Sequence, residues 1–259
     1  MAPPVIVIVP AACQPPSLYT PFAKALEASS ISWIVVSTPS VGASPGLPDF
    51  LPDVAIVRDT VISILDEGRD VVVLMHSYGG IPGSAALRGL GTSERAKMGK
   101  NTGVIRLVYV SCIILRDGEK MQGAGDIENL RKYASKGLDE KAGTLLISPQ
   151  AAAFMFFHDL PEAESQHWAS ILKPHSLGAM WSSQTYTAWQ DIPSTYVVCN
   201  LDRVMPVEKQ EAMIRHAREV QPKAFDVVER VDSGHEPILS KIDDLVGVVE
   251  RAIKGAGTW

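Results

Sequence analysis

The sequence has few cysteines and none of the spacings that bind metals. Among its 259 residues are three cysteines, Cys13, Cys112 and Cys199, and they lie far apart. Each one follows or ends an apolar run, which indicates a buried free thiol rather than a disulfide. This usage of cysteine favours a reducing compartment, and we expect a cytoplasmic protein.

Other absences narrow the class further. No apolar run approaches the roughly 20 residues of a membrane span. The net charge of −5 offers no basic surface for nucleic acid or for an anionic membrane. The N-terminal segment lacks the basic region of a signal peptide, so we interpret it as the first strand. The length suits one large domain, or one domain that carries an insertion.

Apolar runs alternate with amphipathic segments through most of the chain. This alternation predicts an α/β protein whose central sheet is mostly parallel, doubly wound and covered by helices on both faces. The expected strands are 5–9, 32–37, 71–75, 104–110, 194–199 and 224–231, and the main expected helices are 19–28, 51–67, 84–87, 207–218 and 238–253.

The alternation stops in the middle of the chain. Residues 115–184 contain no convincing strand flanked by helices, and they predict short helices over 128–135, 149–157 and 162–172. The segment has the length of a helical lid, or cap, inserted between two strands. We therefore expect a core of residues 1–114 and 185–259 with a lid of residues 115–184.

One stretch, residues 70–83, carries the strongest functional signal. A buried β-branched strand is followed at once by Ser77, then by Gly79 and Gly80, and then by a helix. A serine at a sharp strand-to-helix turn is the context of a nucleophile elbow, which needs small neighbours because strand and helix approach closely. Met75 stands where a first glycine is usual. Taken alone, Ser77 is equally well explained as a helix N-cap.

Partners for a nucleophilic serine occur downstream in the order serine, acid, histidine. A serine needs a base to remove its proton, and the base needs a carboxylate to fix its tautomer. Asp202 and His235 each lie a few residues beyond a predicted strand, where a doubly wound sheet gathers its functional loops. We predict a triad of Ser77, His235 and Asp202. Asp117 is the reserve acid, and we expect His76 to have a packing role.

The tetrahedral intermediate of acyl transfer needs donors for its oxyanion. One expected donor is the backbone N–H of Tyr78, which follows the nucleophile at a helix start. The second is expected in the loop after the first strand, where we choose Ala12. This chemistry implies no metal and no organic cofactor.

At three places the sequence resembles the signatures of α/β-hydrolases. These are residues 76–80 (His-Ser-Tyr-Gly-Gly), 199–206 (Cys-Asn-Leu-Asp-Arg-Val-Met-Pro) and 233–237 (Ser-Gly-His-Glu-Pro). The group it resembles most contains plant methylesterases, hydroxynitrile lyases and related bacterial and fungal esterases. The lyases carry a threonine and a lysine where this chain has Ala11 and Glu236, so cyanohydrin cleavage is not expected.

Together these features predict a serine hydrolase that cleaves a carboxylic ester or lactone of a small, largely apolar molecule through an acyl-enzyme. Two alternatives stay open: a carbon–carbon bond-cleaving or cyclising enzyme with the same triad, and a receptor without catalysis. The expected partner is a small molecule, with no nucleic acid and no membrane, and the chain is either a monomer or a homodimer. The expected pocket residues are Cys13, Phe157, Met180, Trp181 and Tyr186.

Overall fold

A six-stranded parallel sheet forms the centre of the molecule. The computed structural model describes residues 2–121 and 138–255. The strand order is β2-β1-β3-β4-β8-β9, and every neighbouring pair is parallel. This confirms the predicted fold class. The strands are β1 (Val5–Val9), β2 (Ser32–Val35), β3 (Val71–His76), β4 (Val104–Val110), β8 (Ser194–Cys199) and β9 (Val227–Val231).

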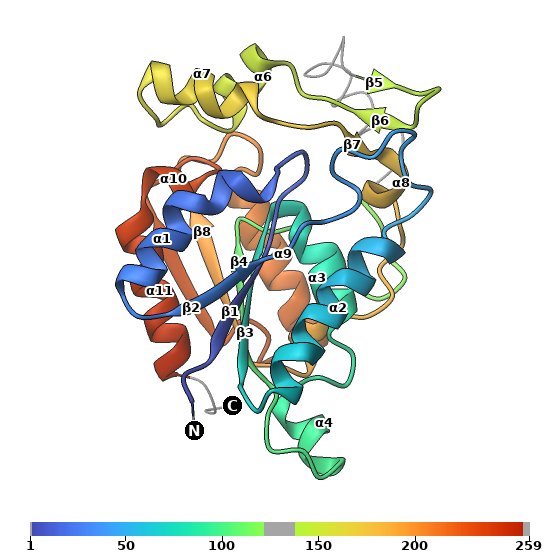
Figure 1. Ribbon diagram of the computed structural model, residues 1–259, viewed down its shortest axis with the longest axis vertical. Helices are drawn as coiled ribbons and strands as arrows, with labels where there is room; N and C mark the ends of the chain where they lie inside the picture. The colour runs from blue at the N-terminus through green and yellow to red at the C-terminus, as the bar shows by residue number, and fades with distance from the viewer. Residues whose placement is uncertain (1, 122–137, 256–259) are drawn as a thin grey trace.

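Helices cover both faces of this sheet (Figure 1). Successive residues of a strand point to opposite faces. Val72 and Leu74 therefore join the apolar cluster under α1 and α11, whereas Val73 and Met75 join the cluster under α2 and α9. The flanking helices are α1 (Thr20–Ala28), α2 (Leu51–Asp66), α3 (Gly80–Ala86), α9 (Val207–Val220) and α11 (Ile242–Lys254), with short η1 (Pro16–Tyr19), η2 (Ser77–Gly79), α4 (Thr92–Lys97), η3 (Ala188–Gln190) and α10 (Pro237–Ser240).

The segment between β4 and β8 lies over the carboxyl ends of the strands (Figure 1). It contains α6 (Pro149–Met155), α7 (Glu162–Ser170) and α8 (Leu177–Met180). It also contains a small antiparallel sheet in the order β5-β6-β7. The prediction of a purely helical lid was wrong on this point, because strands of two residues are too short to show an alternating pattern. They are β5 (Leu138–Asp139), β6 (Thr144–Leu145) and β7 (His175–Ser176).

Smaller differences concern the ends of elements. The predicted final helix is divided into α10 and α11 at Lys241. The predicted last strand begins three residues late, because Phe225 has a positive φ of 51° and turns the chain first. The predicted helix 128–135 and the chain end 256–259 lie outside the described residues.

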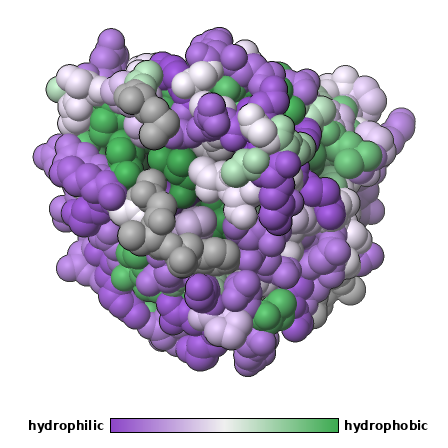
Figure 2. Space-filling model, turned by 90° about the horizontal axis from the view of Figure 1, so that it is seen from below, coloured by the Kyte–Doolittle hydropathy of each residue, from purple (hydrophilic) through white to green (hydrophobic). Residues whose placement is uncertain are grey.

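The three cysteines are buried free thiols, as predicted. Figure 2 shows the end of the molecule opposite the lid, where hydrophilic side chains predominate and apolar ones occur in separate places. Among the described helices, none has both the length and the apolar character required to cross a membrane.

Candidate active site

Ser77 lies at the turn between β3 and α3 with a φ of +50°, a backbone conformation that is uncommon for a residue with a side chain. Gly79 and Gly80 follow Ser77, and backbone atoms of other segments lie too close to them to leave room for a side chain. A Cβ on Gly79 would lie 2.4 Å from the Val9 carbonyl oxygen, and one on Gly80 would lie 2.7 Å from that of Ile113. The turn therefore has the strained, tightly packed geometry of a nucleophile elbow.

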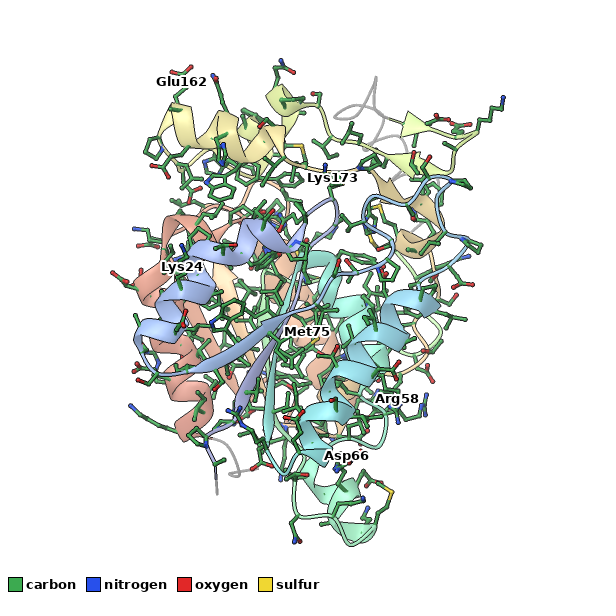
Figure 3. The ribbon with its side chains drawn as sticks, in the orientation of Figure 1. Lys24, Arg58, Asp66, Met75, Glu162 and Lys173 are labelled. Carbon is green, nitrogen blue, oxygen red and sulfur yellow. The ribbon has the colours of Figure 1, made fainter. Side chains whose placement is uncertain are left out.

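Met75, the residue that departs from the usual elbow sequence, is accommodated by a third glycine. A Cβ placed on Gly83 of α3 would lie 2.7 Å from both Cγ and Sδ of Met75. The missing side chain of Gly83 thus leaves room for the side chain of Met75, which is fully buried near the centre of the molecule (Figure 3). The close approach of strand and helix is preserved by moving the glycine from the strand to the helix.

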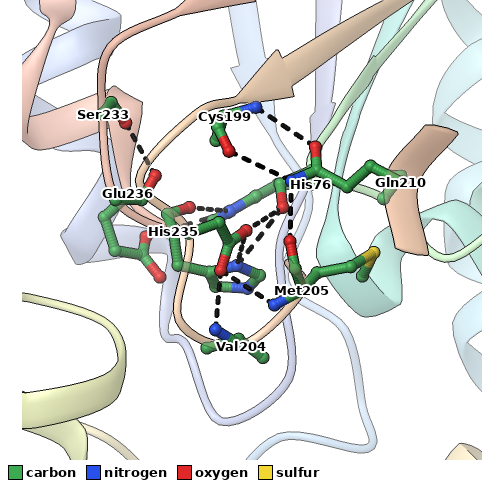
Figure 4. Close-up of polar contacts among 12 residues, drawn as sticks. His76, Cys199, Val204, Met205, Gln210, Ser233, His235 and Glu236 are labelled. Atoms are coloured by element: carbon green, nitrogen blue, oxygen red, sulfur yellow. Dashed lines mark hydrogen bonds and ion pairs between the residues drawn. The ribbon is translucent and has the colours of Figure 1, made fainter. Parts of the chain in front are cut away.

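Asp202 and His235 follow the carboxyl ends of β8 and β9 and meet there; Figure 4 shows His235 among its polar contacts. His235 Nδ1 lies 2.8 Å from Asp202 Oδ2. The other carboxylate oxygen of Asp202 accepts hydrogen bonds from the backbone N–H groups of Val204 at 2.7 Å and Met205 at 2.9 Å. These bonds fix the carboxylate, and the carboxylate in turn fixes the imidazole with Nδ1 as its donor.

This contact favours the charged forms of both partners. Burial by itself would raise the pKa of Asp202, but the neighbouring His235 and the hydrogen bonds to the carboxylate lower it overall. Burial would likewise lower the pKa of His235, but the charge and hydrogen bond of Asp202 raise it overall. A histidine in this setting is suited to take up a proton during a reaction.

Ser111 is a member of this arrangement that the sequence reasoning missed. Its hydroxyl donates a hydrogen bond to Asp202 Oδ2 and lies 3.4 Å from His235 Nδ1. The residue directly follows β4, which is the neighbour of β8 in the sheet, and it has a positive φ of 43°. A serine at a strand end was the only available signal, since its nearness to Asp202 depends on the strand order.

The elbow and the histidine loop are joined through the residue before Ser77. His76 Nε2 lies 2.8 Å from the backbone carbonyl oxygen of His235, and the two rings have centroids 5.1 Å apart. Within the described residues, Ser77 Oγ makes no hydrogen bond to His235, a contact that is often long before substrate binds. The reserve acid, Asp117, is exposed on a turn instead.

The two expected oxyanion donors lie in segments that touch. Gly79 packs against the carbonyl oxygens of Val9 and Pro10, so the loop containing Ala12 lies beside the elbow. In the described part of the chain, the backbone N–H of Ala12 has no hydrogen-bond acceptor. The N–H of Tyr78 has none outside its own short helix. The Tyr78 hydroxyl points away from the site and donates to Asp53 at 2.7 Å.

Known proteins with similar sequences and structures identify the family of this chain. The sequence model of the alpha/beta hydrolase family matches residues 6–248. The chain belongs to the alpha/beta hydrolase family. Alpha/beta hydrolase nvfD of Aspergillus novofumigatus is 31% identical to it over 254 residues, which is 97% of each chain. Methylesterase 17 of Arabidopsis thaliana is 22% identical over 212 residues, covering 76% of this chain and 71% of the relative.

Solved structures agree on the fold of this alpha/beta hydrolase. The crystal structure of polyneuridine aldehyde esterase superposes with a TM-score of 0.72 at 19% identity, and the match covers 96% of this chain and 99% of that one. At this level of identity the likeness concerns the fold.

In this alpha/beta hydrolase, the segment between β4 and β8 is attached to the loops that carry Asp202 and His235. His158 Nε2 lies 2.9 Å from the carbonyl oxygen of Leu201, next to Asp202. The Gly234 N–H, next to His235, donates to Asp159 Oδ2 at 2.6 Å. A Cβ on Gly234 would approach the side chains of His158 and Asp159 to 2.8 Å, so a larger residue there would displace them.

The expected pocket residues divide into two groups. Cys13, Phe157 and Met180 are buried in the apolar cluster that extends from the sheet into the lid, and Trp181 packs against it. Tyr186 lies elsewhere, because it packs against the other apolar cluster and its hydroxyl donates to Asp191 at 2.6 Å. Phe156, which the sequence analysis did not select, has its ring 5.5 Å from the His235 ring.

One group of three side chains is close enough to share a metal ion among the residues that the structure describes. It consists of His76, His235 and Glu236, with ligand atoms within 4.8 Å of one another. Both nitrogens of His76 and Nδ1 of His235 already have hydrogen-bond partners. We therefore do not interpret this group as a metal site.

Proposed function

We propose that this alpha/beta hydrolase cleaves a carboxylic ester or lactone of a small, largely apolar molecule through an acyl-enzyme. The observation that carries the proposal is the 2.8 Å hydrogen bond between His235 Nδ1 and Asp202 Oδ2. Ser77 is held on a strained elbow and directly follows His76, whose Nε2 lies 2.8 Å from the backbone carbonyl oxygen of His235. Ser77, His235 and Asp202 are the three residue types that activate a serine hydroxyl.

In this mechanism the residues have distinct roles. Ser77 Oγ attacks the ester carbonyl while His235 Nε2 takes its proton, and Asp202 stabilises the imidazolium that forms. The backbone N–H groups of Ala12 and Tyr78 hold the oxyanion. His235 then gives the proton to the leaving alcohol, and a water molecule activated by the same imidazole hydrolyses the acyl-enzyme.

The proposed substrate class rests on the lining of the site and on the relatives. Phe156 stands beside the catalytic imidazole. Phe157 and Met180 belong to the apolar cluster above the sheet. A largely apolar acyl or alcohol group fits such surroundings. Methylesterase 17 and polyneuridine aldehyde esterase, which this chain is similar to, are both named for ester cleavage.

The test is a Ser77→Ala variant assayed with p-nitrophenyl acetate. We expect turnover to fall on the order of 10⁶-fold, whereas Ser170→Ala, an exposed serine at the end of α7, should leave it unchanged. Mass spectrometry of the enzyme after a fluorophosphonate probe should show one adduct on Ser77. Unchanged turnover in Ser77→Ala would remove this residue from the mechanism.

Mass spectrometry of the enzyme quenched during turnover of an ester substrate separates ester hydrolysis from the alternative with carbon–carbon cleavage or cyclisation. An acyl group trapped on Ser77 during turnover supports hydrolysis. Product formation that depends on His235 but proceeds without an acyl-enzyme would favour the alternative.

A further inference from the structure

A second buried carboxyl group lies directly behind the catalytic histidine. Glu236 follows His235 in the chain and is completely buried. Its Oε1 lies 2.6 Å from the Gln14 side-chain amide, and its Oε2 has no hydrogen-bond partner within the described residues. A carboxyl group in this position is costly unless it is neutral or well paired, and the triad does not use it.

Glu236 is one end of a chain of hydrogen bonds that reaches the catalytic loop. The other end of the Gln14 amide lies 2.7 Å from the Tyr19 hydroxyl oxygen, which lies 2.8 Å from His76 Nδ1. His76 Nε2 then lies 2.8 Å from the carbonyl oxygen of His235. The Ala11 N–H also donates to Tyr19. The chain thus joins the loop after β1, the elbow and the histidine loop.

The hydrogen bonds between Glu236 and His76 can run in either of two directions. In both cases the net charge of the linked residues is zero. In the first, Glu236 is a neutral acid that donates to Gln14, Gln14 donates to Tyr19, and Tyr19 donates to His76 Nδ1. The two ends of an amide have the same shape, so Gln14 serves either direction. In the second direction every donor is reversed, Glu236 is ionised and His76 is an imidazolium.

Burial decides between the two directions. It raises the pKa of Glu236 to about 8 and lowers that of His76 to about 3, where the charge of His235 also contributes. The nearest nitrogen of His76 is 3.8 Å from Glu236 Oε2, which is too far for a direct hydrogen bond. An ion pair without that bond does not repay its desolvation, so the neutral direction is favoured.

We propose that Glu236 is a positioning residue that acts as a neutral carboxylic acid. Its O–H orients the Gln14 amide and through it the Tyr19 hydroxyl, which donates to His76 Nδ1 and fixes His76 as the tautomer whose Nε2–H holds the backbone carbonyl of His235. The proposal rests on the proposed function, because it gives the triad histidine its support. Loss of the Glu236 proton leaves the Tyr19 hydroxyl as a single donor facing two acceptors, and one link of the chain is lost.

Several ionisable groups surround Glu236 from different parts of the fold. His235 and Asp202 lie on the catalytic loops, and Asp159 comes from the lid. The remaining groups are His76 at the end of β3, Tyr19 of η1 and Cys199 of β8. Of these, Asp202 and His235 form the hydrogen-bonded pair already described. The proposal therefore predicts that activity falls at alkaline pH, where Glu236 loses its proton.

The test compares Glu236→Gln, Glu236→Leu and the wild-type enzyme in pH profiles of kcat with p-nitrophenyl acetate. The amide in Glu236→Gln still donates to Gln14 and cannot ionise. We expect the kcat of the wild type to fall above about pH 8, and we expect Glu236→Gln to keep near wild-type kcat at pH 7 without showing that fall. Glu236→Leu should lose roughly 10- to 100-fold in kcat with little change in KM. Glu229→Gln, a matched change on β9 whose carboxylate pairs with Arg251, should behave as wild type.

Three results would overturn the proposal: the same alkaline fall in the wild type and Glu236→Gln, wild-type kcat in Glu236→Leu, or a rise above pH 8 that only the wild type shows. The last would mean that negative charge on Glu236, rather than its proton, serves the reaction. Retained activity in Ser77→Ala would instead refute the proposed function, so the two failures can be told apart.

Discussion

Two histidine–carboxyl pairs lie side by side in this protein, and they differ in how directly the histidine and the carboxyl group touch. His235 and Asp202 touch through a 2.8 Å hydrogen bond. His76 and Glu236 are separated by 3.8 Å and connected only through Gln14 and Tyr19. The pKa shifts have opposite senses: the first pair is stabilised in its charged form and the second in its neutral form.

The difference shows that burial alone does not fix the charge of a pair. Both pairs are buried, but Asp202 also receives the backbone N–H groups of Val204 and Met205 and the hydroxyl of Ser111. These donors replace the water that the carboxylate has lost. Glu236 has a single amide within reach of one oxygen, and its other oxygen has no hydrogen-bond partner in the described residues, which is too little to hold a charge. The number of donors, rather than the distance from solvent, separates the two pairs.

The largest expected effect comes from breaking the charged pair. Asp202→Asn keeps the shape of the side chain but loses the charge that holds His235 Nδ1–H, so kcat for p-nitrophenyl acetate should fall about 10⁴-fold. Asp117→Asn, at the exposed acid that the sequence left in reserve, should leave kcat unchanged. If instead Asp117→Asn were the damaging change, the assignment of the acid would be wrong.

The fold and the spacing of the three proposed catalytic residues could be read from the sequence, because buried parallel strands are unbroken apolar runs. The strands Val104–Val110 and Ser194–Cys199 coincide with their predicted ranges. The lid strands escaped detection because their pairing is tertiary: β6 is held between β5 and β7, which lie far apart in the chain.

The residues that hold the proposed catalytic side chains in place were harder to predict than those side chains themselves. Ser111, Gln14 and Tyr19 are ordinary polar residues in sequence, and only the strand order brings them to Asp202 and Glu236. Met75 was seen as a departure, but its compensation by Gly83 depends on how α3 crosses β3. Local patterns predicted the elements and their order, whereas contacts between distant segments needed coordinates.

A second prediction concerns stability and the neutral pair. The pKa of Glu236 is raised from 4.5 to about 8, so between these values the folded protein binds a proton that the unfolded chain has released. The free energy of unfolding should therefore fall as pH rises through this window, by on the order of 1 kcal/mol per pH unit from this group. Glu236→Gln should gain stability relative to wild type from pH 5 to pH 8, measured by urea unfolding. A difference independent of pH would show that Glu236 is ionised throughout.

The two members of the charged pair should show trends opposite to each other, and the trend of His235 has the same sign as that of Glu236. Asp202, with a lowered pKa, contributes stability that is present above its ordinary value of 3.8 and is lost as pH falls. His235, with a raised pKa, contributes stability that is present below its ordinary value of 6.5 and is lost as pH rises. Measured against wild type, Asp202→Asn should therefore lose most stability between these two values.

A third prediction tests the elbow that presents both His76 and Ser77. Gly83→Ala should destabilise the protein by about 1–3 kcal/mol, because the new Cβ overlaps the Met75 side chain. The double variant Met75→Ala with Gly83→Ala should lose less stability than the sum of the two single variants, since the smaller side chain vacates the space that the new Cβ needs. Denaturant unfolding of both single variants and of the double variant gives the coupling. Simple additivity would mean that Gly83 does not serve to accommodate Met75.

The smallest expected effect concerns Ser111, where two substitutions distinguish the role of the hydroxyl from that of the backbone conformation. Its hydroxyl is one of the donors that distinguish the charged pair from the neutral one, so Ser111→Ala and Ser111→Gly should both lower kcat by about tenfold, the value of one hydrogen bond to a charged group. Their stabilities should differ, because the positive φ of 43° strains alanine but not glycine. We expect the glycine variant to be more stable by about 1 kcal/mol in thermal unfolding. If both variants lose the same activity although their stabilities differ, the hydroxyl serves catalysis. If activity instead follows stability, Ser111 is a structural residue, and the backbone N–H groups of Val204 and Met205 alone hold the charge on Asp202.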